Sequence, residues 1–368
     1  EADVLVRRVS LTDVRARTRL DVELGPGLNI LVGPNGVGKT TVLEAVALVL
    51  RGAGLRTGAS RDLINTAADY LRVEVVLETA SGTPVTAAVA FDRAGERRLT
   101  ADGAELPDAS RWMEALPLRT FIPDDLRLIK GSPRRRREYL DGLAARVDPG
   151  YRVTLRQYDE ALSQRNSLLR SRRLDDDAQF VPWERILADT GAALAEARAA
   201  RLQSFVGAFQ AMHADLTGAP CDSIRLIYRS NVAGLDAETY AARLAGMRDA
   251  DRQRTFTHLG PHRDDLRLLR RGLDMRECAS QGEQRAAMLT LVLAEWEQMA
   301  SGGQHPLLLL DDVMSELDET RRRALVAVVR QGGQTVVTTT DLRYFSEEEI
   351  AAATVVTLQP EDDAECTW

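Results

Sequence analysis

A glycine-rich segment near the start of the 368-residue chain carries the clearest chemical pattern. It consists of Gly33, Pro34, Asn35, Gly36, Val37, Gly38, Lys39, Thr40 and Thr41, and it fits the G-x-x-x-x-G-K-[ST] pattern of a phosphate-binding loop. An apolar run expected to be a strand precedes this loop, and a helical pattern follows it. Glycines let the backbone turn tightly, so that its N–H groups and the positive helix end face phosphates. We therefore expect Lys39 to reach the β and γ phosphates of a nucleotide and the Thr40 hydroxyl to ligate Mg²⁺.

A second segment, far along the chain, supplies the acidic residues that such a loop requires. The run 307–310 is wholly apolar, which predicts a strand buried on both faces, and it ends in Asp311 and Asp312. We expect Asp311 to hold Mg²⁺, directly or through water, and Asp312 to act with Lys39 in catalysis by orienting or deprotonating the attacking water. Each motif alone has a simpler interpretation, a glycine-rich turn or a solvated strand end. Together they predict nucleotide binding, and ATP is favoured because Lys130, the only other lysine, fits no guanine-reading Asn-Lys-x-Asp motif.

A short polar turn of Ser280, Gln281, Gly282 and Glu283 opens the helix expected before the acidic strand. The simpler interpretation is a capping box, with Ser280 as the N-cap and Glu283 three residues later. The turn also resembles the signature motif of ABC ATPases, in which Ser and Gly at a helix N-terminus bind the γ-phosphate of ATP held by a second subunit. Both interpretations can hold together, because a capped helix end is itself an anion site.

Three further positions are compared with the ABC pattern. Asp318 is expected either to cap the next helix or to belong to the loop through which ABC dimers communicate. Thr340 stands where many ABC proteins carry a histidine that contacts the γ-phosphate, and Asp312 stands where most have the longer Glu. These two departures predict slow hydrolysis. No glutamine is evident at the usual Mg²⁺-sensing position, and Asp124 or Asp125 is the candidate substitute.

The periodicity of apolar residues predicts an α/β fold that is interrupted by a helical insertion. The resemblance to ABC ATPases implies that this fold is an ABC-type phosphate-loop ATPase head of mixed sheet flanked by helices, with the insertion as an α-helical arm lobe. Short alternating runs fill the first 100 residues and include a hairpin at Ser81-Gly82, whereas helical spacing dominates from about 124 to 216. More than 260 residues separate the two nucleotide motifs, so a lobe is inserted between them. The expected parts are 1–123, the N-terminal half of the head, 124–218, the lobe, and 219–368, the C-terminal half.

Composition limits the setting and the partners. No run is long and apolar enough for a membrane span, and the three cysteines are few and far apart, so we expect a cytoplasmic protein without a membrane partner, disulfide framework or zinc site. The net charge of −7 argues against nucleic acid, but arginines gather at 15–19, 134–137 and 170–173. Each cluster is either a phosphate-binding surface or a solvated helix face. His258 and His262 are four residues apart, but Pro261 between them disfavours a shared helical face and hence a metal site.

Three segments resemble motifs of the RecF family. They are Phe121–Leu126 with its continuation through Lys130–Pro133 to Arg136–Asp141, then Gln164–Leu169, and Gly260–Leu266. The likeness covers nearly the whole chain and is least distinctive from about 170 to 220 and in the tail. The insert of about 100 residues is too short for the long coiled coil of the related SMC family.

The resemblance implies an ATP-dependent DNA-binding protein and a weak, DNA-stimulated ATPase. Such a protein forms a homodimer on ATP, binds duplex, gapped or junction DNA, and assists RecA loading together with RecR and RecO. Two other ABC-type functions stay open, the motor subunit of a membrane transporter and an ATPase that regulates a nuclease. The arginine-rich insert and the RecF-like segments disfavour the transporter.

Overall fold

The computed structural model describes residues 4–55, 60–79, 81–109, 116–171, 177–303 and 306–360, and the chain divides into two units. Residues 1–125, 215–218 and 289–368 form the first unit, and residues 126–214 and 219–288 form the second. The expected lobe ended at residue 218, whereas the second unit continues to residue 288. The reason is a small sheet in 224–274 that pairs within this unit and packs on its helix α4.

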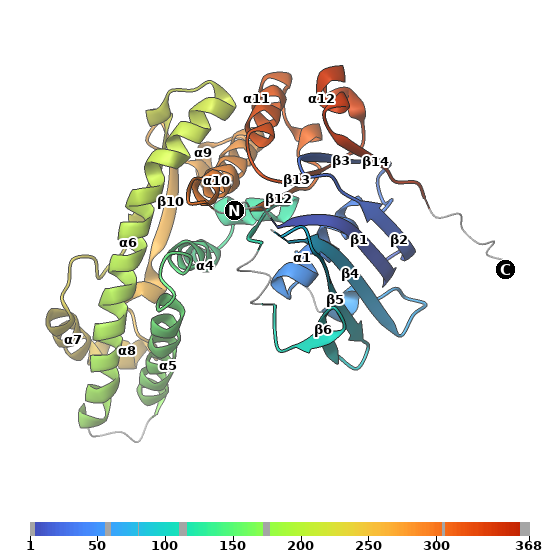
Figure 1. Ribbon diagram of the computed structural model, residues 1–368. Helices are drawn as coiled ribbons and strands as arrows, with labels where there is room; N and C mark the ends of the chain where they lie inside the picture. The colour runs from blue at the N-terminus through green and yellow to red at the C-terminus, as the bar shows by residue number, and fades with distance from the viewer. Residues whose placement is uncertain are drawn as a thin grey trace, which may run out of the picture. The chain divides into compact units, whose positions relative to one another are not determined.

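A parallel sheet forms one layer of the first unit (Figure 1). Its order is β14-β3-β13-β12-β8, with bounds β3 Leu28–Val32, β8 Leu118–Phe121, β12 Leu307–Leu310, β13 Thr335–Thr339 and β14 Thr354–Thr357. Every residue of β12 and β13 is buried, as expected of parallel strands covered on both faces. Because all five strands are parallel, the loops after β3, β13 and β12 meet at one edge of the sheet.

An antiparallel sheet forms a second layer, in the order β2-β1-β4-β5-β6-β7. The bounds are β1 Leu5–Val14, β2 Arg17–Glu23, β4 Tyr70–Glu78, β5 Pro84–Asp92, β6 Arg97–Ala101 and β7 Ala104–Leu106. Alternate residues of β4 are buried, so this sheet presents one face to the core. Helix α1, Lys39–Arg51, packs against strands of both sheets, and eleven of its side chains are buried there. The phosphate-binding loop is therefore attached to the most buried helix of the unit.

Further helices complete the first unit. They are α11 Glu319–Arg330, α12 Glu347–Ala351 and the greater part of α10 Gln281–Ser301, whose first turns belong to the second unit. Trp296 of α10 is buried, and its indole N–H donates to the carbonyl of Pro306 over 2.7 Å. This bond fixes the helix to the segment that leads into β12.

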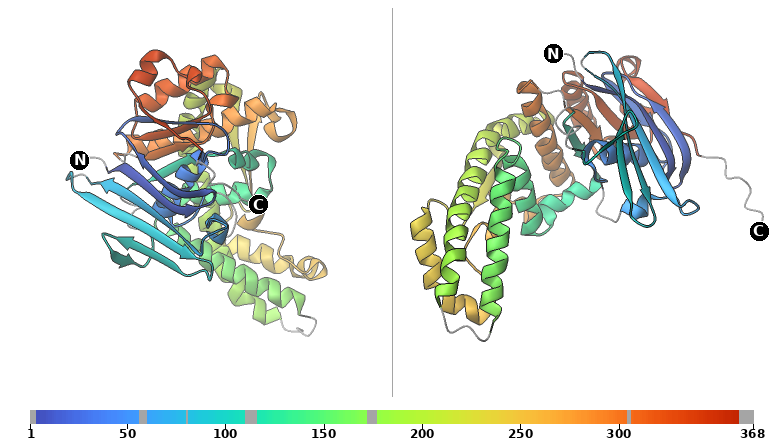
Figure 2. Two further views of the ribbon diagram at one scale, coloured as in Figure 1. Left: turned by 90° about the vertical axis from the view of Figure 1, so that its right-hand side faces the viewer. Right: turned by 60° about the horizontal axis from the view of Figure 1, so that its bottom comes forward.

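The second unit is mainly helical. Its helices are α3 Arg127–Lys130, α4 Pro133–Ala144, α5 Tyr151–Arg170, α6 Val181–Thr217, α7 Ala237–Gly246, α8 Arg248–Arg254 and α9 Met275–Cys278. The small antiparallel sheet has the order β11-β10-β9, with β9 Ile224–Arg229, β10 Asp265–Arg270 and β11 Leu273–Asp274. Helices α5 and α6 run side by side (Figure 2, right) and share an apolar core with α7.

Two buried arginines connect the elements of this unit. Arg165 of α5 donates to Asp251 over 2.7 Å and to Glu184 over 3.2 Å, and its side chain is fully buried. Arg198 of α6 is also buried, and it donates to Asp141 over 2.8 Å and to Asp264 over 3.0 Å. A buried charge is tolerated only where it is paired and hydrogen-bonded, so these pairs specify how the helices pack.

Most of the expected elements are present in the structure. The strand expected before the loop, the helix expected after it and the strand expected at 307–310 are present as β3, α1 and β12, and the Ser81-Gly82 hairpin joins β4 to β5. Strand β8 and helices α7 and α8 were not predicted. The helical spacing expected from about 124 to 216 corresponds to α3, α4, α5 and α6, and residues 172–176 within it lie outside the described residues.

Candidate nucleotide-binding site

The phosphate-binding loop has an open, glycine-dependent backbone. Gly36 and Gly38 adopt φ values of 82° and 91°, a left-handed conformation that other residues rarely adopt. Gly36 is exposed, and a Cβ atom at this position would meet nothing within 4 Å. Gly38 is also the N-cap of α1, and no side chain caps this helix end. The first N–H groups of a buried helix are thus available to an anion.

Lys39 folds back over this loop. Its Nζ donates to the carbonyls of Gly33 and Pro34 over 2.7 and 2.8 Å, and the residue is buried. Burial lowers the pKa of Lys39, and the carboxylates of Asp312 and Asp311 act in the opposite direction. The ammonium group therefore lies where the loop backbone and the acidic strand end converge.

Thr40 and Asp311 come together from opposite ends of the chain. The Thr40 hydroxyl lies 2.9 Å from each carboxylate oxygen of Asp311. Thr338, at the end of β13 between them, donates its hydroxyl to Asp311 over 2.8 Å and accepts from the N–H of Asp312 over 2.8 Å. A carboxylate and a hydroxyl are the hard oxygen ligands that Mg²⁺ prefers. The two residues predicted to hold a metal are thus in contact, their role as metal ligands stays a prediction, and Thr338 is a support that the sequence reasoning missed.

Asp312 shows two signs of a functional residue. Its φ is 47°, a left-handed conformation unusual for any residue but glycine. Its Oδ1 atom is buried and has no hydrogen-bond partner among the described residues. Backbone strain and unsatisfied buried oxygens concentrate at sites that receive a ligand or water. The orphaned oxygen fits the expected task of orienting a water molecule.

Arg17 also contacts the loop and was not predicted to belong to the site. Its Nε donates to the carbonyl of Val37 over 2.9 Å, and its Nη2 donates to the carbonyl of Gln359 over 2.5 Å. The residue is buried, and a Cβ atom added to Gly38 would lie 3.0 Å from its Nε. Arg17 therefore joins the start of β2 and the segment after β14 to the loop, whereas its neighbour Arg15 pairs with Glu44.

The remaining expected positions of the first unit have identifiable local roles. Asp318 caps α11, because its carboxylate accepts from the N–H of Arg321 over 3.0 Å. Thr340 is half-buried directly after β13, at the sheet edge that carries Asp311. Asp125 accepts from the N–H of Ile122 over 2.8 Å, and burial raises its pKa to about 6. The capping prediction for Asp318 is confirmed, and the other roles of these residues stay predictions.

The serine-glycine turn lies in the second unit and is accessible. Ser280 and Gln281 are exposed, and a Cβ atom at Gly282 would meet nothing within 4 Å. The capping box is confirmed: the Ser280 N–H donates to Glu283 over 2.9 Å, and the Glu283 N–H donates to the Ser280 hydroxyl over 3.3 Å. The Ser280 hydroxyl accepts in this pair, so its own proton is available to an incoming anion.

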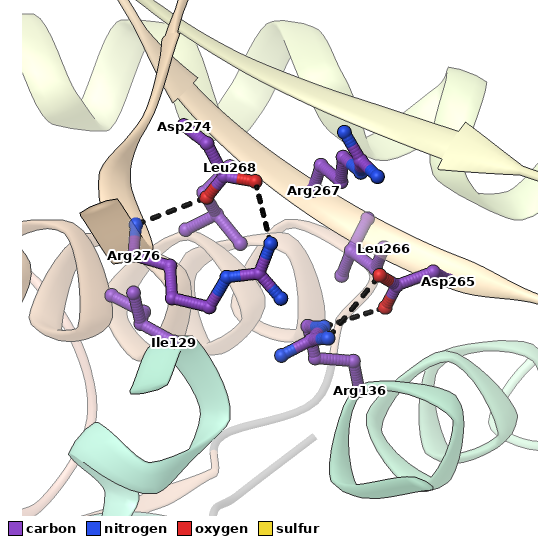
Figure 3. A pocket seen from close by; sticks show the side chains of 8 residues that line it. All are labelled: Ile129, Arg136, Asp265, Leu266, Arg267, Leu268, Asp274 and Arg276. Atoms are coloured by element: carbon purple, nitrogen blue, oxygen red, sulfur yellow. Dashed lines mark hydrogen bonds and ion pairs between the residues drawn. The ribbon is translucent and has the colours of Figure 1, made fainter. Parts of the chain in front are cut away.

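The arginines of α4 divide between structural and surface roles. Arg136 is buried and donates to both carboxylate oxygens of Asp265, over 2.6 and 3.2 Å (Figure 3). Arg137 donates to the carbonyl of Asp264, and exposed Arg134 pairs with Glu138. Arg136 and Arg137 are thus occupied by the fold. Of the cluster at 170–173, residues 172 and 173 lie outside the described residues.

The two histidines singled out for a metal have other partners. The Nε2 of His262 lies 2.9 Å from the carbonyl of Thr257, and its Nδ1 lies 2.6 Å from the hydroxyl of Tyr158. Burial lowers the pKa of His262 to about 4. The Nδ1 of His258 lies 2.8 Å from Asp251. Both rings therefore belong to the hydrogen-bonded core of the second unit.

Among all the residues that the structure describes, no group of three or more His, Cys, Asp or Glu side chains is arranged to hold a metal ion. Across the described part of the chain, no helix combines the length and the apolar character that crossing a bilayer requires.

Comparisons with known proteins agree with this geometry. Residues 5–362 match the family described as RecF/RecN/SMC N terminal domain. The DNA replication and repair protein RecF of Roseiflexus castenholzii is 35% identical over 360 residues, covering 86% of this chain and 88% of that protein. The corresponding protein of Heliobacterium modesticaldum is 36% identical over 328 residues, covering 86% and 87%.

Solved structures show the same fold. The structure of the recombination mediator protein RecF-ATP in the RecFOR pathway matches with a TM-score of 0.80 and 28% identity, covering 94% of each chain. The Smc head bound to the C-winged helix domain of ScpA matches with a TM-score of 0.58 and 15% identity, a likeness of fold alone. The predicted ATPase-head fold is confirmed by these neighbours.

Proposed function

Because the chain belongs to the RecF family, we propose that it is an ATP-dependent DNA-binding protein of recombinational repair. The observation that carries the proposal is the convergence of Thr40, Asp311 and Thr338 beside an open phosphate-binding loop. These residues belong to segments at opposite ends of the chain, and the gathering of their oxygens beside a helix N-terminus supports a nucleotide–metal site. A solved RecF structure described as RecF-ATP, similar over 94% of the chain, supports ATP as the nucleotide.

Each residue has a defined task in the proposed site. The loop N–H groups and Lys39 bind the phosphates, and Lys39 exchanges its bonds to Gly33 and Pro34 for bonds to phosphate oxygens. Thr40 and Asp311 would hold Mg²⁺, which supplies positive charge to the phosphoryl group being transferred. Asp312 orients the attacking water through its unpartnered oxygen. The shorter reach of Asp312 and the presence of Thr340 instead of a histidine support slow turnover, and the likeness to RecF proteins supports its stimulation by DNA.

The exposed turn at Ser280 and Gly282 supports an ATP-dependent homodimer. In this proposal, ATP bound to the loop of one subunit meets the Ser280 hydroxyl and the α10 N-terminus of another. Nothing crowds Gly282, so a phosphate group can approach its backbone closely. Dimerisation is therefore the event that ATP controls.

The relatives supply the biological context of the proposal. They are described as DNA replication and repair proteins, and the solved neighbours as mediators in the RecFOR pathway. We accordingly propose that the dimer binds duplex, gapped or junction DNA and acts with RecR and RecO to assist RecA loading. ATP hydrolysis is then the step that releases the DNA.

Analytical ultracentrifugation with and without ATP, Mg²⁺ and a gapped duplex tests the proposal. We expect Lys39→Ala to lose ATP binding and the dimer together, because the phosphates lose their main cation. Asp312→Asn is expected to bind ATP and to prolong the dimer, because only the water is disturbed. The matched control is Lys130→Ala, which removes the only other lysine, an exposed one, and keeps ATP binding. An ATP-dependent dimer that persists in Lys39→Ala contradicts the site assignment.

A further inference from the structure

Glu283 places a negative charge at the turn that, in the proposed function, meets a triphosphate. Its Oε2 atom accepts from the N–H of Ser280 over 2.9 Å, so the carboxylate lies beside the hydroxyl expected to bind the γ-phosphate. Like charges at this separation repel each other. An uncompensated Glu283 would also offset the positive end of α10, which is the main attraction for a phosphate there.

Arg270 compensates this charge. Its Nη1 forms an ion pair with Oε1 of Glu283, whereas the other carboxylate oxygen, Oε2, takes part in the capping box. The side chains of Arg270 and Glu283 are 33% and 27% exposed, so water screens the pair less than it screens a fully exposed one. Arg270 is the last residue of β10 and is paired with residues of both neighbouring strands. The cation is therefore delivered from a fixed part of the sheet.

The backbone around the turn is held independently of this pair. The Nε2 of Gln284 donates to the carbonyls of Met275 and Ala279 over 2.9 and 3.2 Å. Asp274 caps the short helix α9 by accepting from the N–H of Arg276 over 3.0 Å (Figure 3). Because these bonds keep the turn in shape without Arg270, the loss of Arg270 is expected to change the charge of the turn more than its conformation.

We propose that Arg270 is a positioning residue for nucleotide binding across the dimer: it neutralises Glu283 and holds that carboxylate against the Ser280 backbone, so the turn presents a net positive surface to the γ-phosphate of the second subunit. The inference rests on the proposed ATP-dependent dimer and adds to it a residue outside the signature turn. It also explains how a turn with an acid can serve as an anion site.

Four proteins test the inference by sedimentation in ATP and Mg²⁺: the unsubstituted chain, Arg270→Met, Arg270→Lys, and Arg270→Met combined with Glu283→Gln. For Arg270→Met we expect the protein concentration at half-dimerisation to rise about tenfold, the size of a typical coupling between adjacent charged groups. Arg270→Lys restores most of the affinity because it restores the charge. The double variant also recovers, because Gln keeps the capping box but carries no charge.

Urea unfolding of the same four proteins separates electrostatics from folding. If Arg270 serves only to stabilise the second unit, each change in half-dimerisation concentration is matched by a fall in the urea midpoint, and that result overturns the inference, as does an unrecovered double variant. Dimerisation of Arg270→Met at the concentration of the unsubstituted chain overturns it equally. If the unsubstituted chain binds ATP but stays monomeric, the proposed function itself fails, and the role of Arg270 fails with it.

Discussion

Arg165 offers the sharpest test of how the second unit is held together. Its guanidinium is fully buried in α5 and donates to Asp251, Thr257 and the carbonyl of Leu244, over 2.7, 2.9 and 3.0 Å. The substitution Arg165→Met keeps an apolar stem of similar length and removes only the charged group. Asp251, whose own side chain is fully buried, then loses its charged partner.

The expected loss of folding stability depends on which hydrogen bonds Asp251 keeps in Arg165→Met. Removing one partner of a buried ion pair costs about 3–5 kcal/mol, because the other charge is left unpaired in a poorly solvated place. Asp251 keeps the bonds from the His258 N–H and ring, at 3.2 and 2.8 Å, and Glu184 keeps Arg248. The lower end of the range, about 3 kcal/mol, therefore applies. For a unit of this size that loss lowers Tm by roughly 6–12 °C.

Urea and thermal unfolding followed by circular dichroism measure the effect. The control is Arg156→Met, an exposed arginine of the same helix, whose stability is expected to stay within about 0.5 kcal/mol of the unsubstituted chain. The double variant Arg165→Met/Asp251→Asn should lose less than the sum of the two single losses, since neither charge is then left alone. A loss below about 1 kcal/mol for Arg165→Met, or strict additivity, would refute the reasoning.

Two further predictions concern His262 and Gly38. His262 has a pKa of about 4, below the usual 6.5, so its contribution to stability is complete above pH 6.5 and is lost as pH falls through 4, by at most about 3 kcal/mol. The urea midpoint should fall more steeply between pH 6.5 and 4 in the unsubstituted chain than in His262→Gln, and an equal fall in both proteins would contradict this prediction. The second substitution, Gly38→Ala, should destabilise the first unit by about 1–2 kcal/mol and weaken ATP binding, because the φ of Gly38 is 91° and the new Cβ would lie 3.0 Å from Arg17 Nε. Isothermal titration with ATP checks it beside Gly27→Ala, where a Cβ meets nothing within 4 Å, and equal affinities for both variants would contradict it.

The parts of the fold that local pattern encodes were predictable. The loop, the strand before it and the all-apolar strand β12 are each recognisable from neighbouring residues alone. The order of the parallel strands is not, because it depends on contacts between distant segments. Thr338 supports Asp311 only because β13 lies between β3 and β12, and in the sequence it is one of three consecutive threonines. Arg17 likewise reaches Val37 through the sheet arrangement and not through any local motif.

Strand β8 shows the limit of periodicity. Its four residues, Leu118–Phe121, include an arginine and a threonine and are too few to alternate clearly. The strand forms because it pairs in parallel with β12, and the N–H of Asp311 donates to the Phe121 carbonyl over 2.9 Å. A tertiary contact thus determines the strand, and the same contact helps to position the acidic end of β12.

The segments that carried the RecF resemblance turn out to hold the second unit together. Arg165 and Asn166 of the second segment bind Asp251 and Thr257. In the third segment, Asp264 accepts from Arg198 and Tyr228, and His262 lies against Tyr158. These side chains bind one another across α5, α6, α8, β9 and the segment 257–265. Packing of buried polar groups therefore accounts for the residue types at these positions of the RecF-like segments.

The distribution of acids explains why the proposed reaction needs a metal. A triphosphate is strongly negative, and in the proposed site it lies beside the carboxylates of Asp311 and Asp312 as well as the ammonium of Lys39. The hydroxyls of Thr40 and Thr338 bind Asp311 but carry no charge that would neutralise it. The two carboxylates therefore repel the phosphates that Lys39 and the helix N-terminus attract, and a divalent cation held by Asp311 would lower that repulsion. At Glu283 no metal is needed, because Arg270 supplies the compensating charge from the protein itself. The two faces proposed to enclose ATP therefore solve the same electrostatic problem differently, one with an exchangeable ion and the other with a fixed arginine.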